Sequence, residues 1–290
     1  MAKKITALFF FSLDCSNFGV NKLSSMKVFN FIRFIFCCLL LGGFFQVGVA
    51  QCDLRTNGKE TLRLEMLSEG GTNGAGITWN PERKIYYCAM AGNMSYPIEV
   101  FNSQGSSIYN DAAGFDFRGF WYNPKTKSVE GNGYKNFGIW QSNMNSKGFP
   151  AGEGITILEI TNQPDDNSCG AFEPKKQLVY FLEPGLSIFS ITRSGKMSKK
   201  KIQLKDCPAD EGSINYTTLI YTACKGKEFG ILDYEEFKIY FFSKKGKFAG
   251  EVSLPDNATP ESAFGFSYAN EMVFIFDKEN RVWTGYKICQ

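Results

Sequence analysis

From residue 61 to the C-terminus, short apolar runs alternate with polar turn residues, and the runs are rich in β-branched and aromatic side chains. The runs are about four to eight residues long, and none keeps the 3.6-residue period of a helix. The pattern therefore predicts an all-β chain. The expected strands are 61–67, 76–79, 84–90, 98–102, 106–109, 118–122, 127–131, 137–142, 154–160, 169–172, 177–182, 186–192, 199–204, 217–223, 228–232, 237–242, 247–254, 262–268, 272–276 and 281–288.

A motif recurs at the start of three strand groups. It reads GITWNPERKIYY at 76–87, GFWYNPKTKSVE at 119–130 and, more loosely, CGAFEPKKQLVY at 169–180. The motif prolines Pro81, Pro124 and Pro174 are 43 and 50 residues apart, and recurrence over such a distance indicates a repeated supersecondary structure. Asn followed by Pro favours a type I turn, so the motif is expected between the first and second strands of each unit. Asn80 and Asn123 as metal or sugar ligands are the alternative interpretation.

The expected strands form four groups of four and a last group of three, with strand 61–67 left over at the start. Pairing 61–67 with 281–288 completes the last group and removes both open edges, which otherwise promote aggregation. The count predicts a five-bladed β-propeller whose ring is closed by the N-terminal strand.

The repeat texture over residues 61–289 resembles that of the β-propeller superfamily, with blades similar to the NHL, YVTN and WD types. The Trp-Asp signature of WD repeats is absent, and no single family is matched. The resemblance implies a ligand held over a central funnel. It also implies an alternative, because some five-bladed propellers are glycosidases that use inward-facing carboxylates.

The first 50 residues have a different character from the rest. Residues 26–51 have a short basic start, an apolar run and the small-residue end Gly48-Val49-Ala50, which is the layout of a secretory signal peptide. We expect cleavage after Ala50, initiation at Met26, and an exported protein in which residues 51–290 form one domain. The apolar run is shorter than the roughly 20 residues of a membrane-spanning helix.

Removing residues 1–50 changes the charge balance. They hold five of the 32 basic residues and one of the 29 acidic residues, which leaves 27 and 28. No general positive charge remains to indicate nucleic acid binding. The expected strands and turns assign each charged residue to one of the two faces of the ring. On this assignment, acidic residues gather on the face that carries the connections between blades. Basic residues gather on the other face, which we expect to contact an anionic envelope polymer or lipid. Three of those basic residues are Lys244, Lys245 and Lys247.

Six cysteines follow residue 50, and the chain has no histidine. Exported cysteines commonly form disulfides, and a zinc site or a His-dependent triad is excluded. Because 61–67 is expected beside 281–288, we predict a Cys52–Cys289 disulfide. A second pairing, Cys169 with Cys207, is predicted from connections on one face. Cys88 and Cys224 are expected as buried thiols.

No motif identifies a catalytic residue. We therefore predict a binding or interaction module with a glycan, small molecule or protein ligand over the acidic face. The alternative is an exported hydrolase, glycosidase-like or lactonase-like, that uses carboxylates or a metal. Asp165, Asp166 and Asn167 are candidate Ca²⁺ ligands, although the same stretch is typical of a solvated turn. The candidate ligand-binding residues are Asp111, Asp116, Arg118, Asp165, Asp166, Tyr96 and Tyr134.

Overall fold

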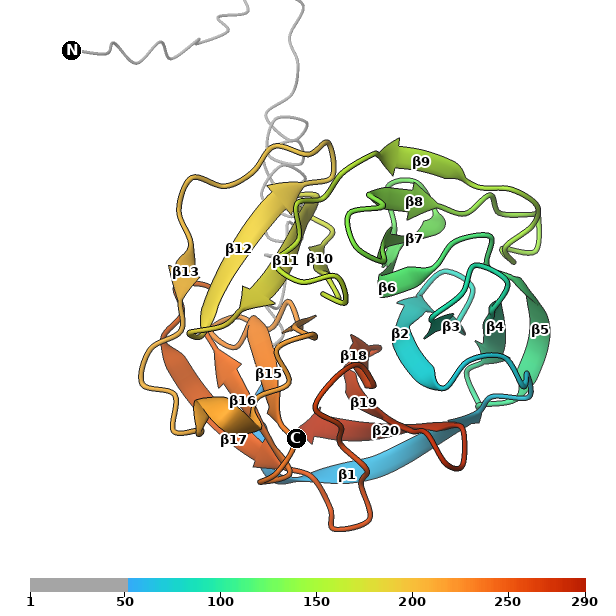
Figure 1. Cartoon of the computed structure of the whole chain (residues 1–290). Coiled ribbons are helices and arrows are strands. Elements are labelled where there is room, and N and C mark those ends of the chain that lie inside the picture. Colours follow the sequence, from blue (N-terminus) through green and yellow to red (C-terminus); the bar gives the residue numbers. More distant parts are fainter. Residues whose placement is uncertain (1–51) are drawn as a thin grey trace, which may run out of the picture. The chain divides into compact units, whose positions relative to one another are not determined.

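The computed structural model of the chain describes residues 52–290, so the predicted leader lies outside the described residues. These residues form twenty strands and one short 3₁₀ helix, η1 (Glu211–Ser213). They contain no helix that is long and apolar enough to cross a membrane. The strands form four sheets that stand around a central space in a propeller-like arrangement (Figure 1). The all-β prediction is confirmed.

Three of the sheets are antiparallel and four-stranded, and each is formed by consecutive strands. The first sheet contains β2 (Asn73–Asn80), β3 (Ile85–Ala91), β4 (Pro97–Asn102) and β5 (Ser107–Ala112). The second contains β6 (Phe117–Asn123), β7 (Ser128–Gly133), β8 (Ile139–Gln141) and β9 (Ile155–Leu158). The third contains β10 (Ala171–Glu173), β11 (Leu178–Glu183), β12 (Ser187–Thr192) and β13 (Ile202–Gln203).

The fourth sheet has eight strands and consists of two sets of four. We call β14 (Ile220–Tyr221), β15 (Phe229–Asp233), β16 (Lys238–Phe242) and β17 (Phe248–Ser253) the fourth quartet. We call β18 (Phe266–Ala269), β19 (Met272–Asp277), β20 (Val282–Cys289) and β1 (Leu54–Glu65) the last quartet. The two quartets meet where β17 and β1 run parallel, with Asn57 opposite Ser253.

The N-terminal strand completes the last quartet, as predicted. β1 pairs antiparallel with β20 from Leu54 opposite Cys289 to Glu65 opposite Val282. The strand begins at Leu54, earlier than the predicted residue 61, because its pairing with β20 continues after irregularities in the register. The two ends of the described chain are therefore neighbours in one sheet (Figure 1).

The innermost strand of each set of four contacts the innermost strand of the next. β2 contacts β6, β6 contacts β10, β10 contacts β14, β14 contacts β18, and β18 contacts β2. Side-chain hydroxyls join some of these neighbours. The Ile77 amide donates to Ser267 Oγ at 3.0 Å, and the Tyr122 amide donates to Thr78 Oγ1 at 2.7 Å. Hydrogen bonds thus connect neighbouring sheets through the strands nearest the centre.

Asn132, at the end of β7, connects the second and third sheets. Its side chain is fully buried, and its Oδ1 accepts hydrogen bonds from the amides of Gly119 at 3.0 Å and Gly170 at 2.9 Å. Its Nδ2 donates to Gln163 Oε1 at 2.9 Å and to the Ser168 carbonyl at 2.7 Å. All four hydrogen-bonding positions of the amide are used, as a buried polar group requires.

Large apolar side chains fill the space between neighbouring sheets. Between the last quartet and the first sheet, Trp283, Tyr86 and Phe274 are almost fully buried in one cluster. The backbone of Gly74 lies so close to the indole of Trp283 that a Cβ there would be 2.3 Å from the ring. A glycine at this position therefore lets β2 approach the last quartet.

The repeated motif forms the turn between the first two strands of each of the first three sheets. The turns span 81–84, 124–127 and 174–177. Asn80 Oδ1 accepts hydrogen bonds from the amides of Glu82 at 3.1 Å and Arg83 at 3.2 Å, which is typical Asx-turn chemistry. The Lys84 amide donates to the Asn80 carbonyl, so the turn is one residue longer than the predicted type I turn. The turn interpretation of the motif is confirmed.

Candidate functional site

The central space contains a cavity of about 320 Å³ whose wall includes residues from all five innermost strands. Each of these strands provides at least one aromatic side chain. These include Trp79 from β2, Trp121 from β6, Phe172 from β10, Tyr221 from β14 and Tyr268 from β18. The motif prolines Pro81, Pro124 and Pro174 also line it. The repeated motif therefore contributes to the cavity wall as well as to the turns.

Contacts among these rings and with residues outside the cavity hold several of them in place. Trp121 stacks on Phe172 with ring centroids 5.3 Å apart, and Tyr221 stacks on Tyr180 at 5.9 Å. The indole Nε1 of Trp121 donates to Glu130 Oε2 at 3.3 Å. A ring that is fixed before binding loses little conformational entropy when a ligand stacks on it.

Glu130 fixes Trp121 through a buried polar network. Its carboxylate is fully buried and forms an ion pair with Arg193, with Nε 2.9 Å from Oε2. Asn123 Nδ2 and Thr126 Oγ1 donate to its other oxygen at 3.0 and 2.9 Å. Arg193 follows β12, so this network connects the second and third sheets behind the cavity wall.

The cavity wall is uncharged. Among residues 52–290, those that line the cavity include no Asp, Glu, Lys or Arg. Burial, followed by the charge of Glu173, raises the pKa of Tyr221, and burial, followed by the proximity of Cys224, raises the pKa of Tyr268. Both phenols are therefore protonated at neutral pH. The wall offers aromatic faces and hydroxyl groups, which suit an uncharged ligand with one apolar face.

Glu173 and Lys244 form an ion pair beside this wall. Glu173 Oε1 lies 2.5 Å from Lys244 Nζ, and its Oε2 accepts a hydrogen bond from the Tyr180 hydroxyl at 2.6 Å. Burial alone would raise the pKa of Glu173. The hydrogen bonds from Lys244 and Tyr180 and the charge of Lys244 outweigh burial, so the pKa lies below the ordinary value of 4.5.

We expect acid to destabilise the protein partly through Glu173. Because its pKa is lowered on folding, the stability that it contributes is present above its unfolded pKa and is lost as the pH falls through the folded value. Urea unfolding between about pH 7 and pH 3 should show a shallower loss of stability for Glu173→Gln than for the parent chain. Parallel pH profiles for the two proteins would contradict this assignment.

The structure brings together four of the seven predicted ligand-binding residues, but not at the cavity. Arg118 is 4 % exposed and forms an ion pair with Asp116, with Nη1 and Oδ1 2.5 Å apart. Its guanidinium lies 4.6 Å from the ring centroid of Tyr134. Asp166 joins this group through its carbonyl, which accepts from the Lys135 amide at 2.8 Å. None of these residues lines the cavity.

The other three predicted residues have local contacts. Asp111 is exposed on β5 and accepts a hydrogen bond from the Tyr109 hydroxyl at 3.1 Å. Asp165 Oδ1 accepts from the Asn167 amide at 2.8 Å, as in a polar turn. The ring of Tyr96 packs against Gly71 and belongs to the margin of a core cluster. A ligand at any of the seven residues stays a prediction.

The aromatic residues of the cavity wall were not among the ligand-binding residues predicted from the sequence. Strand aromatics usually pack between sheets, and Trp121 and Phe172 are indeed largely buried. The sequence signal that could have revealed them is their position relative to the motif, because Trp79 and Phe172 each lie two residues before a motif proline. A recurrent aromatic next to a recurrent turn predicts one ring from each unit at the same level of the wall.

The cysteine predictions have mixed outcomes. Cys52 and Cys289 form a disulfide with Cα atoms 5.2 Å apart, as predicted. The predicted Cys169–Cys207 bond was wrong, since both are free. Cys169 is buried beside the innermost strands, with Thr218 as its bridge partner, whereas Cys207 packs in the core between the third sheet and the fourth quartet.

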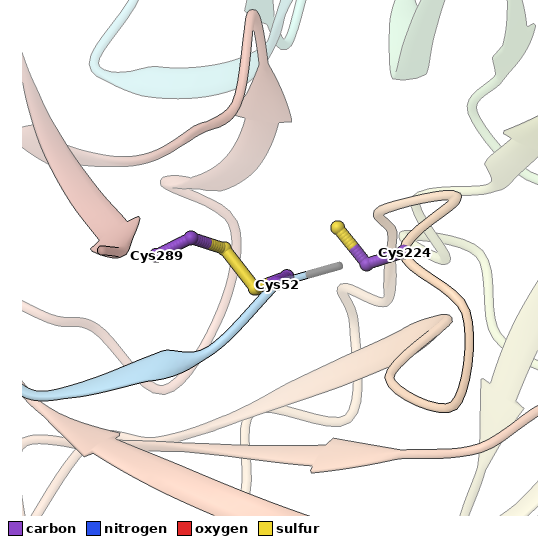
Figure 2. A group of neighbouring side chains, drawn as sticks. All are labelled: Cys52, Cys224 and Cys289. Carbon is purple, nitrogen blue, oxygen red and sulfur yellow. A yellow bond between two sulfur atoms is a disulfide. The ribbon is translucent and has the colours of Figure 1, made fainter. Parts of the chain in front are cut away.

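One cysteine cluster was not predicted. Among residues 52–290, one group of three His, Cys, Asp or Glu residues has ligand atoms that all lie within 4.8 Å of one another. It consists of Cys52, Cys224 and Cys289 (Figure 2).

Comparisons with known proteins give only distant similarities. No family model matches the chain, and no curated protein matches it in sequence. Among solved structures, a Bacteroides thetaiotaomicron protein of unknown function is 10% identical, with a TM-score of 0.47 over 83% of this chain and 74% of that one. A gluconolactonase from Xanthomonas campestris is 12% identical, with a TM-score of 0.48 over 81% and 96%.

The calcium-binding protein regucalcin from Agrobacterium tumefaciens is 11% identical, with a TM-score of 0.45 over 81% of this chain and 96% of that one. At these identities and TM-scores we transfer no residue role from any of these proteins.

Proposed function

We propose that residues 52–290 are an exported five-bladed β-propeller that binds an uncharged ligand in its central cavity, with a glycan as the preferred class. The closed series of contacts among five innermost strands supports the blade count. The Cys52–Cys289 disulfide supports export, because disulfides persist in oxidising compartments.

The uncharged aromatic wall is the observation that carries the ligand class. A pyranose ring has apolar C–H faces and a rim of hydroxyl groups. Trp79 and Tyr268 offer half-buried rings to such a face, and the neutral phenols of Tyr221 and Tyr268 offer hydroxyl oxygens that can accept hydrogen bonds. A hydrolase of the two-carboxylate type needs an acid and a partner carboxylate at the reacting bond. The wall therefore favours binding over hydrolysis.

Binding of neutral oligosaccharides tests the proposal. Trp79 and Trp121 line the cavity, so titrations should change the tryptophan fluorescence of the parent protein. We expect Trp79→Ala and Tyr268→Ala each to weaken binding by about tenfold, or 1.4 kcal/mol, the upper range of a stacking contact. Phe137→Ala is the matched control, because Phe137 is an exposed aromatic outside the cavity and its removal should leave the affinity unchanged.

The acidic face predicted from the sequence is the competing location for the ligand. If Asp111→Asn or Asp165→Asn abolishes binding while Trp79→Ala does not, the ligand lies on that face and the cavity proposal fails. If oligosaccharides or lactones are hydrolysed, and Asp116→Asn with Asp166→Asn removes the activity, the hydrolase alternative is correct. Repeating the titration with Ca²⁺ and with a chelator shows whether the ion takes part.

We also propose that the basic face contacts an anionic envelope polymer or lipid. Lys245 and Lys247 are better placed for this role than Lys244, which is engaged with Glu173. Such a contact is electrostatic, so it should weaken as the salt concentration rises.

A further inference from the structure

A free thiol lies beside the disulfide that joins the two ends of the described chain. Cys52 directly precedes β1, Cys289 ends β20, and Cys224 lies in the loop between β14 and β15. The three sulfur atoms all lie within 4.8 Å of one another. Figure 2 shows the Cys224 side chain next to the Cys52–Cys289 bond. Cys224 is free and 9 % exposed.

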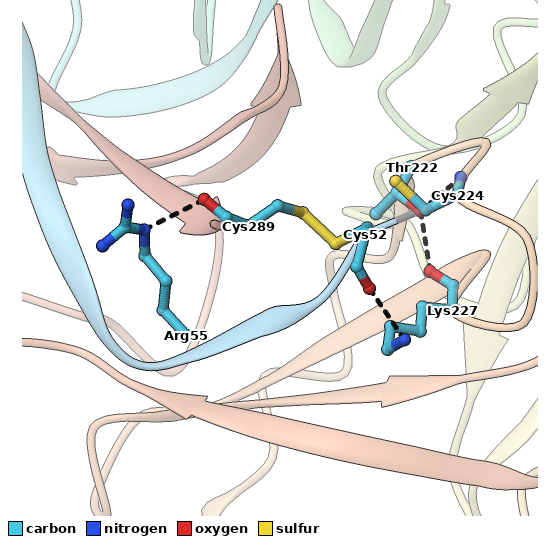
Figure 3. The surroundings of a disulfide bond; sticks show 6 residues. All are labelled: Cys52, Arg55, Thr222, Cys224, Lys227 and Cys289. Atoms are coloured by element: carbon cyan, nitrogen blue, oxygen red, sulfur yellow. Dashed lines mark hydrogen bonds between the residues drawn. A yellow bond between two sulfur atoms is a disulfide. The ribbon is translucent and has the colours of Figure 1, made fainter. Parts of the chain in front are cut away.

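Lys227 holds Cys52 against the loop of Cys224 without help from the disulfide. Its Nζ donates to the Cys52 carbonyl at 2.8 Å, and its own amide donates to the Cys224 carbonyl at 3.0 Å (Figure 3). The loop itself is fixed, because the Cys224 amide donates to Thr222 Oγ1 at 3.1 Å. Cys52 and Cys224 would therefore stay neighbours if the bond to Cys289 opened.

The C-terminal partner is also held independently of its sulfur. Arg55 Nε donates to the Cys289 carbonyl at 2.9 Å, and the Gln290 amide donates to the Asp53 carbonyl at 3.0 Å. β1 and β20 would thus remain paired after the disulfide opened.

We propose that Cys52, Cys224 and Cys289 form a thiol–disulfide exchange site. The Cys224 thiolate attacks Sγ of Cys52, an S–S bond forms between Cys224 and Cys52, and the bond between Cys52 and Cys289 breaks. Cys289 leaves as a thiolate and takes up a proton, which replaces the proton that Cys224 lost. One disulfide and one thiol are present before and after, so no oxidant or reductant is needed.

Exchange changes both the covalent connection and the accessible thiol. The bond moves from the pair β1 and β20 to β1 and the loop before β15. The free thiol moves from buried Cys224 to half-buried Cys289, one residue before the C-terminal Gln290. In the exchanged form, the half-buried Cys289 thiol is available to external disulfides or to a second copy of the protein.

Disulfide mapping of the folded protein tests the exchange. The oxidised parent protein is incubated without denaturant at mildly alkaline pH, quenched with acid, alkylated and digested for mass spectrometry. Acid stops exchange because only the thiolate attacks. We expect a Cys52–Cys224 peptide pair beside the Cys52–Cys289 pair, together with alkylated Cys289. A single Cys52–Cys289 pair with Cys224 always alkylated would overturn the proposal.

Variants distinguish exchange from scrambling in unfolded chains. Oxidised Cys289→Ser should form the Cys52–Cys224 bond, and Cys224→Ser should leave Cys52–Cys289 as the single disulfide. Cys207→Ser is the matched control, because it removes a half-buried free thiol outside the cluster and should not change the products. Equal yields of bonds to Cys88, Cys169 or Cys207 in the parent would show scrambling and refute a specific exchange site.

Discussion

Replacing Cys52 and Cys289 together by alanine will lower the free energy of unfolding by about 4–5 kcal/mol, because the bond closes a loop of 237 residues in the unfolded chain. Denaturant unfolding of the oxidised parent and the double variant measures the difference. Both residues must be replaced, since a single replacement leaves Cys224 able to pair with the remaining cysteine.

Reduction provides the control for this result. The reduced parent should approach the stability of the double variant, because both lack the loop closure while their β1–β20 pairing is the same. If the oxidised and reduced parent proteins unfold at the same denaturant concentration, the disulfide does not stabilise the fold and the loop argument is incorrect.

Replacing Arg193 by methionine will destabilise the protein by about 3–5 kcal/mol, because it leaves the buried Glu130 carboxylate without a cation. Glu130 is fully buried and its pair with Arg193 has an N–O distance of 2.9 Å. The double variant Arg193→Met with Glu130→Gln should regain much of this loss, since no unpaired charge remains. Equilibrium unfolding of the three proteins measures these differences.

A surface pair offers the matched comparison. Lys127 and Glu82 form an ion pair at 3.1 Å whose side chains are 67% and 56% exposed. Lys127→Met should cost less than about 1 kcal/mol, as is usual for solvent-exposed pairs. Equal costs for Arg193→Met and Lys127→Met would show that burial of Glu130 does not matter. The Arg193 variant should also alter tryptophan fluorescence, because Glu130 holds the Trp121 indole.

The strand groups and the closure by β1 could be predicted because they depend on local patterns and on edge pairing. Alternation of apolar and polar residues indicates a strand. The last group has three strands and one strand is left over at the start, so pairing the two removes both open edges. The disulfide followed from the same step, since pairing of β1 with β20 brings the residues near their ends together.

The cavity wall and the contacts between sheets could not be predicted in the same way. In a strand, a shift of one residue moves every side chain to the other face. Register shifts occur in β2 between Gly74 and Gly76 and in β6 between Phe117 and Gly119. Such irregularities decide which face of the sheet Trp79 and Trp121 occupy. The alternation of apolar and polar residues does not reveal them. The partners Glu130 and Arg193 lie in different units, and nothing in either unit indicates the other.

The order in which the chain is synthesised affects the pairing of β1 with β20. β1 is synthesised long before its antiparallel partner β20, since Cys52 and Cys289 beside their paired ends are 237 residues apart in sequence. Contacts between residues so distant in sequence form slowly, and an unpaired strand edge is prone to associate with other chains in the meantime. β1 must therefore be kept from wrong partners until β20 has been made, so the pairing of these two strands forms late.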